Sequence, residues 1–231
     1  MWKMERPDSD WDIGQAYILD SRSFLLGVKS NSHNSKKEKG DKDPDIDIIY
    51  PCETDIQSHE IGKIVAELQR SNVNYIWNVM SPIIIYENRH WLRDLRMIVA
   101  SNMSKNIFHS IMGMSRHNIY HFIDRGDKGS LIYKKKLNTI GRTIQFGINV
   151  LLYNKFLFQK TDIHSKEELD ELMIRFQSIY AQSQLPAKPD PKPYEEFLIK
   201  IRMDHLRRDL QEGLIRGDYR FLQLSQTDDS L

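Results

Sequence analysis

The spacing at which apolar residues recur along this chain changes near residue 60. Residues 11–18 alternate between apolar and polar side chains, and residues 45–59 hold a second extended segment, so both stretches predict strands. From Ile61 the apolar residues recur at the spacing of one helix face, with Ser58 as the expected N-cap. A chain whose strands come first and whose helices follow is expected to form an α+β fold.

The helical part is expected to be the larger one. Its predicted helices span residues 88–103, 104–123, 130–153, 166–182 and 194–213. A capping box of Ser165 and Glu168 marks the start of the fourth helix. We therefore expect an α/β head over residues 1–86 and a helical domain over residues 87–231, with the polar stretch 29–44 forming a mobile loop in the head.

Charge is distributed unevenly along the chain. The 231 residues have a formal net charge of +1, yet residues 1–60 hold thirteen acidic against eight basic side chains, and residues 95–161 hold two against eleven. This asymmetry suggests that one part binds cations and another an anion, although solvated faces that happen to segregate would look the same. The single cysteine, Cys52, excludes an intrachain disulfide, and no apolar run is long enough for a membrane helix. We expect a cytoplasmic protein with no membrane partner.

A pair of aspartates near the start of the chain is the sharpest chemical motif. On a strand Asp10 and Asp12 project to the same side, where two carboxylates repel each other unless a cation lies between them. Mg²⁺ prefers carboxylate oxygens, and two such ions can stabilise the attacking and leaving oxygens of a phosphoryl-type transfer. The second extended segment offers a third carboxylate in Asp55, with Asp47 and Glu53 as alternatives. A solvent-facing pair at a strand end is the structural alternative.

These residues resemble a known family. The segment PDSDWDI is followed, after a variable loop, by Asp55, Glu60 and Lys63 in the spacing D-x-x-x-x-E-x-x-K. This arrangement is similar to the predicted nucleotidyltransferases of the DNA polymerase beta superfamily, in particular to the branch associated with RNA repair. The resemblance continues in NVNYIWNVMSP over residues 72–82 and, in order and spacing, over most of residues 1–200. It implies a minimal nucleotidyltransferase head followed by a helical domain.

The resemblance also implies roles for individual residues. Asp10 and Asp12 match the paired metal-binding aspartates, and Asp55 matches the third, which would also act as, or position, the base for the attacking hydroxyl. Ser9 and Lys63 are candidate contacts to the nucleotide. Family members transfer a nucleoside monophosphate from a nucleoside triphosphate, so we expect an enzyme that uses Mg²⁺ or Mn²⁺ and acts on an acceptor such as an RNA end.

One part of the superfamily pattern has no match in this sequence. In the superfamily a Gly-Ser or Gly-Gly pair precedes the first aspartate and holds the triphosphate, whereas this sequence opens with Met1-Trp2-Lys3-Met4 about where that pair would end. The expectation is either that the natural protein begins upstream of Met1 or that the chain is a shortened member. A degenerate, non-catalytic nucleotide- or RNA-binding protein of the same fold is therefore the alternative function.

Further candidates lie in the basic middle of the chain. The helix predicted over residues 130–153 has a polar face without acids, which could receive a triphosphate or an RNA backbone, although an ordinary solvated face would look the same. Its candidate phosphate contacts are Lys135, Lys136, Asn138 and Arg142. His117 and His121 have the i, i+4 spacing of two zinc ligands, but no third ligand is evident, so we expect surface or RNA-facing histidines.

Overall fold

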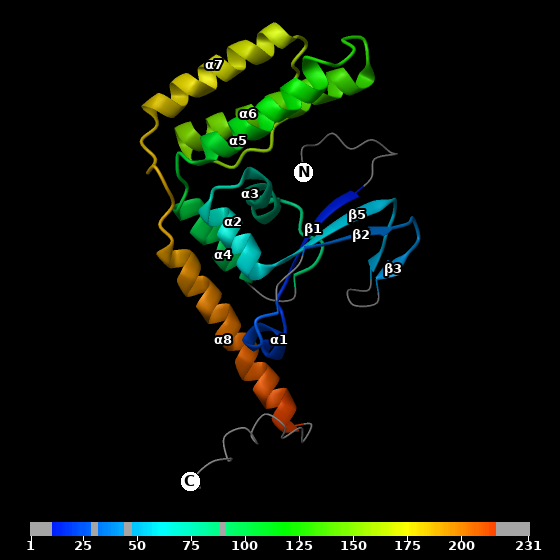
Figure 1. Ribbon diagram of the computed structural model, residues 1–231, viewed down its shortest axis with the longest axis vertical. Coiled ribbons are helices and arrows are strands. Elements are labelled where there is room, and N and C mark those ends of the chain that lie inside the picture. Colours follow the sequence, from blue (N-terminus) through cyan, green and yellow to red (C-terminus); the bar gives the residue numbers. More distant parts are fainter. Residues whose placement is uncertain (1–10, 29–31, 44–47, 88–90, 216–231) are drawn as a thin grey trace.

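A computed structural model describes residues 11–28, 32–43, 48–87 and 91–215, apart from the side chains of residues 214 and 215 (Figure 1). The strands are β1 (Trp11–Tyr17), β2 (His33–Lys37), β3 (Lys42–Asp43), β4 (Ile48–Ile49) and β5 (Thr54–Glu60). The helices are α1 (Ser21–Leu25), α2 (Ile61–Gln69), α3 (Val73–Met80), α4 (Trp91–Ser101), α5 (Ile107–Asn118), the π-helical turn η1 (Ile119–Ile123), α6 (Leu131–Tyr153), α7 (Lys166–Gln182) and α8 (Lys192–Ile215). The fold is α+β, as the change of period predicted.

The main sheet has three strands in the order β1-β5-β2. β5 is parallel to β1 and antiparallel to β2, so the last strand in the sequence lies at the centre. A parallel pair needs a long crossover connection, and here this connection contains α1, β2 and the small β3–β4 hairpin.

The mobile loop predicted over residues 29–44 is wrong for part of that range. Residues 33–37 form β2, and Lys42–Asp43 form β3. The five residues of β2, HNSKK, contain no apolar side chain and are mostly exposed. This edge strand is held by its backbone pairing with β5, and such pairing leaves no hydrophobic pattern in the sequence.

Helix starts follow local side-chain chemistry. α7 begins and ends where predicted, and the Glu168 N–H donates to Ser165 Oγ at 3.2 Å, which confirms the predicted cap. The predicted cap of α2 is wrong. Ser58 lies within β5 and donates to Gln15, whereas the Glu60 carboxylate accepts the Gly62 N–H at 2.6 Å. Glu60 ends the strand and caps the helix at once.

The elements form a sheet and two groups of helices (Figure 1). Helices α2, α3 and α4 lie beside the sheet, α5, α6 and α7 lie at one end of the molecule, and α8 runs back along α4 and α2 to α1. One cluster of buried apolar side chains extends from Ile61 on α2 to Ile201 on α8. The division into domains at residue 86 stays a prediction. Among the described residues, none of the helices combines the length and the apolar character that crossing a bilayer demands.

Candidate functional site

Two of the predicted carboxylates lie side by side on the sheet. In the parallel register of β1 and β5, Asp12 lies opposite Asp55. Register partners on neighbouring strands project to the same face, so the two carboxylates share one surface. Asp12 is exposed and the side chain of Asp55 is 47% exposed, which leaves both accessible to ions and to a substrate.

The central position of β5 adds a basic residue to this pair. Lys36 of β2 lies opposite Asp55 on the other side, and its Nζ is 3.4 Å from Asp55 Oδ1. The row across the sheet is therefore Asp12, Asp55, Lys36. An ion pair this exposed contributes at most about 1 kcal/mol, so Lys36 only partly offsets the charge of the two aspartates. Lys36 was not predicted as a candidate because it lies in the stretch that was expected to form a loop.

The carboxylate pair fits part of a magnesium site. Carboxylate oxygens are the ligands that Mg²⁺ and Mn²⁺ prefer. In the part of the chain that the structure describes, no group of three or more His, Cys, Asp or Glu side chains is placed to hold a metal ion. Asp12 and Asp55 thus form a partial ligand set. The predicted metal ligand Asp10, the predicted nucleotide contact Ser9 and the alternative carboxylate Asp47 lie outside the described residues.

Helix α3 approaches the same face of the sheet at Gly14 and Gln57, which follow Asp12 and Asp55 by two residues on their strands. Gly14 lies opposite Gln57, and a β-carbon at Gly14 would come within 2.8 Å of Asn78 Cγ on α3. Only glycine allows this close approach without moving Asn78. The side-chain amide of Asn78 therefore lies over β1, one row away from Asp12 and Asp55.

A second polar group, formed by Ser32, His59 and Lys63, lies at the far end of this face. His59 Nδ1 is 2.8 Å from Ser32 Oγ, and Lys63 Nζ donates to the same hydroxyl oxygen at 2.5 Å. The ring of Tyr75 on α3 lies against His59, with ring centroids 5.0 Å apart. Burial, and then the charge of Lys63, lowers the pKa of His59, which favours the neutral imidazole. Of these residues, Lys63 was predicted from the sequence to contact the nucleotide.

Two of the candidates on α6 form hydrogen bonds within α6 or with the segment that follows it. The side chain of Asn138 accepts the Ile163 N–H at 2.9 Å, and Arg142 donates to Thr139 Oγ1 at 3.0 Å. Burial lowers the pKa of Arg142, which reflects the packed surroundings of its guanidinium. These contacts tie α6 to itself and to the segment that follows it. The roles predicted for Asn138 and Arg142 in phosphate binding stay predictions.

Lys135 and Lys136 lie in the first two turns of α6, and the histidine pair lies on the preceding elements α5 and η1. Lys135 is exposed, and Lys136 Nζ lies 4.3 Å from the centroid of the Phe122 ring on η1. His117 and His121 are exposed with ring centroids 4.4 Å apart. Among the described residues this pair belongs to no metal-binding group, and its role stays a prediction.

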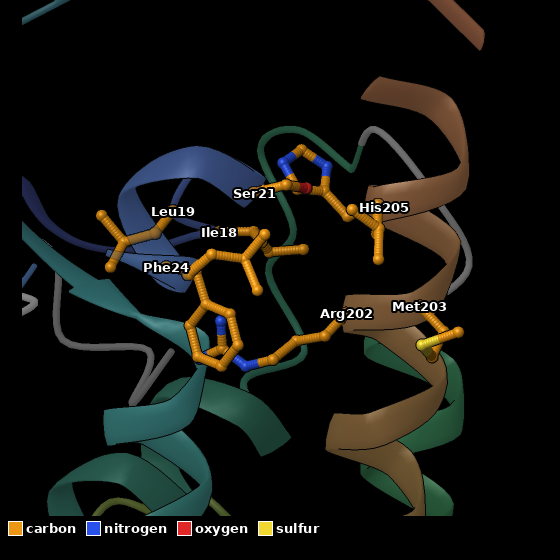
Figure 2. A pocket seen from close by; sticks show the side chains of 9 residues that line it. Ile18, Leu19, Ser21, Phe24, Arg202, Met203 and His205 are labelled. Carbon is orange, nitrogen blue, oxygen red and sulfur yellow. The ribbon is translucent and has the colours of Figure 1, made fainter. Parts of the chain in front are cut away.

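A cavity of about 190 Å³ lies elsewhere, between α1 and α8. Figure 2 shows Arg202 reaching from α8 towards the Phe24 ring, whose centroid is 3.9 Å from the guanidinium carbon. Arg202 also donates to the Glu60 carboxylate at 2.8 Å. Because α1 follows the end of β1 and Asp12 lies near its beginning, this cavity is at the opposite end of the strand from the carboxylate pair.

The small mixed sheet, the aspartates paired across β1 and β5, and the helices that follow define a polymerase-beta-like head with a helical region. The family model described as the RNA repair pathway DNA polymerase beta family matches residues 1–149. The chain belongs to this family, as the resemblance predicted. Membership suggests a polymerase-beta-like nucleotidyltransferase with a role in RNA repair.

One curated protein is similar over part of the chain. The uncharacterized protein MJ0002 of Methanocaldococcus jannaschii is 29% identical over 108 residues, which are 47% of this chain and 40% of that protein. The chain therefore covers less than half of that relative. No solved structure matches this chain significantly.

Proposed function

We propose that this chain is a metal-dependent nucleotidyltransferase that transfers a nucleoside monophosphate from a nucleoside triphosphate to an acceptor hydroxyl. The observation that carries the proposal is the register of β1 and β5, which sets Asp12 opposite Asp55 on an accessible sheet face. Family membership supports an RNA end as the acceptor, and a cytoplasmic location is the setting that we expect.

In this proposal Asp12, Asp55 and Lys36, which form one row across the sheet, have different roles. Asp12 and Asp55, with Asp10, would hold Mg²⁺ or Mn²⁺, which when bound supplies positive charge to the phosphate oxygens. Asp55 would also accept, or orient, the proton of the attacking hydroxyl. Lys36 would neutralise Asp55 when no ion is bound, since its Nζ lies 3.4 Å from that carboxylate.

Label transfer tests the proposal. The chain is incubated with each α-labelled nucleoside triphosphate, Mg²⁺ or Mn²⁺, total RNA and cell extract. We expect label on RNA and at least a ~100-fold loss in Asp12→Asn and in Asp55→Asn, because a metal site supplies several kcal/mol of transition-state stabilisation. Glu53→Gln is the matched control, since Glu53 precedes β5 and is one of the two alternatives, with Asp47, for the third carboxylate. A loss in Glu53→Gln with activity kept in Asp55→Asn would contradict the assignment of Asp55.

Binding measurements separate the enzyme from a degenerate binder. We expect the double variant Asp10→Asn with Asp12→Asn to lose Mg²⁺-dependent nucleotide binding while it keeps its fold, as judged by circular dichroism. Metal-dependent binding that survives in this variant would contradict the metal site. Nucleotide or RNA binding by the unmodified chain, without label on any acceptor, would instead support the non-catalytic alternative.

A further inference from the structure

The group formed by Ser32, His59 and Lys63 brings hydrogen-bond donors together at one point of the sheet. A hydroxyl and an ammonium group meet at Ser32 Oγ, and the ring of His59 closes the group at 2.8 Å. The lysine ammonium has three donor hydrogens, of which this contact uses one. Donors of this kind, one of them charged, bind phosphate oxygens well.

The group lies on the same face as the carboxylate pair. Asp55 and His59 are both on β5 and an even number of residues apart, so their side chains project to the same side. Four residues along a strand correspond to about 13 Å. Gln57 projects from this face between them, with Asn34 opposite it on β2, so polar side chains line the whole path.

The charges at the two ends of this path differ in sign. Asp12 and Asp55 lie at one end, whereas Lys63 lies at the other, in the first turn of α2, where the helix dipole adds partial positive charge. The carboxylate that caps α2, Glu60, projects to the opposite face and is bound by Arg202. The path thus offers oxygen ligands to a cation at one end and phosphate donors at the other.

We propose that Ser32, His59 and Lys63 form a subsite for the terminal phosphates of a nucleoside triphosphate whose α-phosphate lies at Asp12 and Asp55. This inference rests on the proposed function and assigns the orientation of its substrate. The triphosphate lies along β5 from the carboxylate pair towards α2. Lys63 contributes charge, Ser32 a hydroxyl, and His59 is a positioning residue that fixes the hydroxyl.

Binding of Mg²⁺-tripolyphosphate, measured by titration calorimetry, tests the subsite without the nucleoside. Lys63→Ala is expected to weaken this binding about 10- to 100-fold, the equivalent of one charged hydrogen bond, and Ser32→Ala is expected to weaken it less. Binding of the nucleoside monophosphates should not change in either variant. Lys37→Ala is the matched control, because Lys37 lies on the opposite face of β2 and is expected to leave tripolyphosphate binding unchanged.

The positioning role of His59 has its own readout. His59→Asn, whose amide can replace Nδ1 as the partner of Ser32, is expected to bind tripolyphosphate more tightly than His59→Leu. Thermal unfolding of each variant checks that the fold is kept.

The outcomes distinguish this inference from the proposed function. Label transfer that depends on Asp12 and Asp55, together with unchanged tripolyphosphate binding in Lys63→Ala, would overturn the subsite and leave the transferase. Tripolyphosphate binding that is lost in Lys63→Ala, without transfer to any acceptor, would keep the subsite in a non-catalytic binder. A chain that binds neither tripolyphosphate nor any nucleoside triphosphate would overturn both.

Discussion

Single residues set the electrostatic character of the candidate site. Asp55 has an aspartate on one neighbouring strand and a lysine on the other, so its surroundings are close to neutral until a cation arrives. His59, two rows further along β5, lies between Ser32 and the ring of Tyr75. Burial by these neighbours favours the uncharged imidazole, and this preference has a consequence for stability.

We expect His59 to make the fold less stable in acid. Its folded-state pKa lies below the ordinary value of 6.5, so the unfolded chain binds the proton more readily. The stability that the fold gains from neutral His59 is fully present above pH 6.5 and is lost as the pH falls below that value. Urea unfolding midpoints between about pH 7.5 and about pH 5 should fall less steeply in His59→Asn than in the unmodified chain. The same change at the exposed His164 serves as control, and equal slopes in the unmodified chain and His59→Asn would contradict the prediction.

At the scale of elements, α6 is the centre of the helical region. Its Gly147 is buried, and a β-carbon there would lie 2.6 Å from Ile111 Cδ1 on α5 and 2.6 Å from Phe176 Cζ on α7. The absence of a side chain at this position lets three helices approach each other. Gly113 on α5 differs, because a β-carbon there would have no neighbour within 4 Å.

Alanine at these two glycines is expected to have opposite effects. Gly147→Ala forces Ile111 and Phe176 to move and should lower the free energy of unfolding by about 1–3 kcal/mol, less the gain in helix propensity. Gly113→Ala removes only the flexibility of glycine within a helix and should raise the free energy of unfolding by up to about 1 kcal/mol. Denaturant unfolding measures both changes. A stabilised Gly147→Ala variant would show that the helices separate at little cost.

The elements also show what a sequence can predict. The bounds of α7 were predicted correctly because Ser165, Glu168 and the apolar spacing are local signals. β2 was missed because its five polar residues depend on a partner strand far along the sequence. Ser32 and Lys36, which the sequence did not mark as candidates, lie on or beside that strand. Asp12 and Asp55 were predicted as metal ligands from carboxylate chemistry and the family pattern, which need no knowledge of the sheet, and the structure shows that they are register partners.

At the scale of the whole molecule, α8 joins the two parts of the predicted division. Arg202 on α8 donates to Glu60 at the end of β5, and the side chain of Asp209 accepts the Ser21 N–H of α1 at 3.0 Å. The side chain of Glu60 is 3% exposed, so Arg202 compensates a buried charge. The sequence pattern placed α8 in a helical domain, because a periodic face does not reveal which element it will contact.

Removal of Arg202 is expected to weaken the whole molecule. Arg202→Met leaves the Glu60 carboxylate buried with an uncompensated charge and should cost about 3–5 kcal/mol in denaturant unfolding. The double variant with Glu60→Gln should lose less than Arg202→Met alone. Lys200→Met is the matched control on the same helix, since its ion pair with Asp94 is more exposed and is worth at most about 1 kcal/mol. If Arg202→Met and Lys200→Met lowered the free energy of unfolding equally, the result would contradict a buried ion pair at Glu60.

The order of strands bears on how the protein emerges from the ribosome. β1 and β2 both pair with β5, which is synthesised after them. Because the ribosome adds about 5–20 residues per second, β5 is completed a few seconds after β1. During this interval the edges of β1 are unpaired and accessible to other chains. The polar residues of β2 are suited to this interval, because charged and hydrophilic edges resist aggregation. Apolar substitutions at its exposed positions are therefore expected to reduce soluble yield during synthesis more than they change the stability of the finished fold.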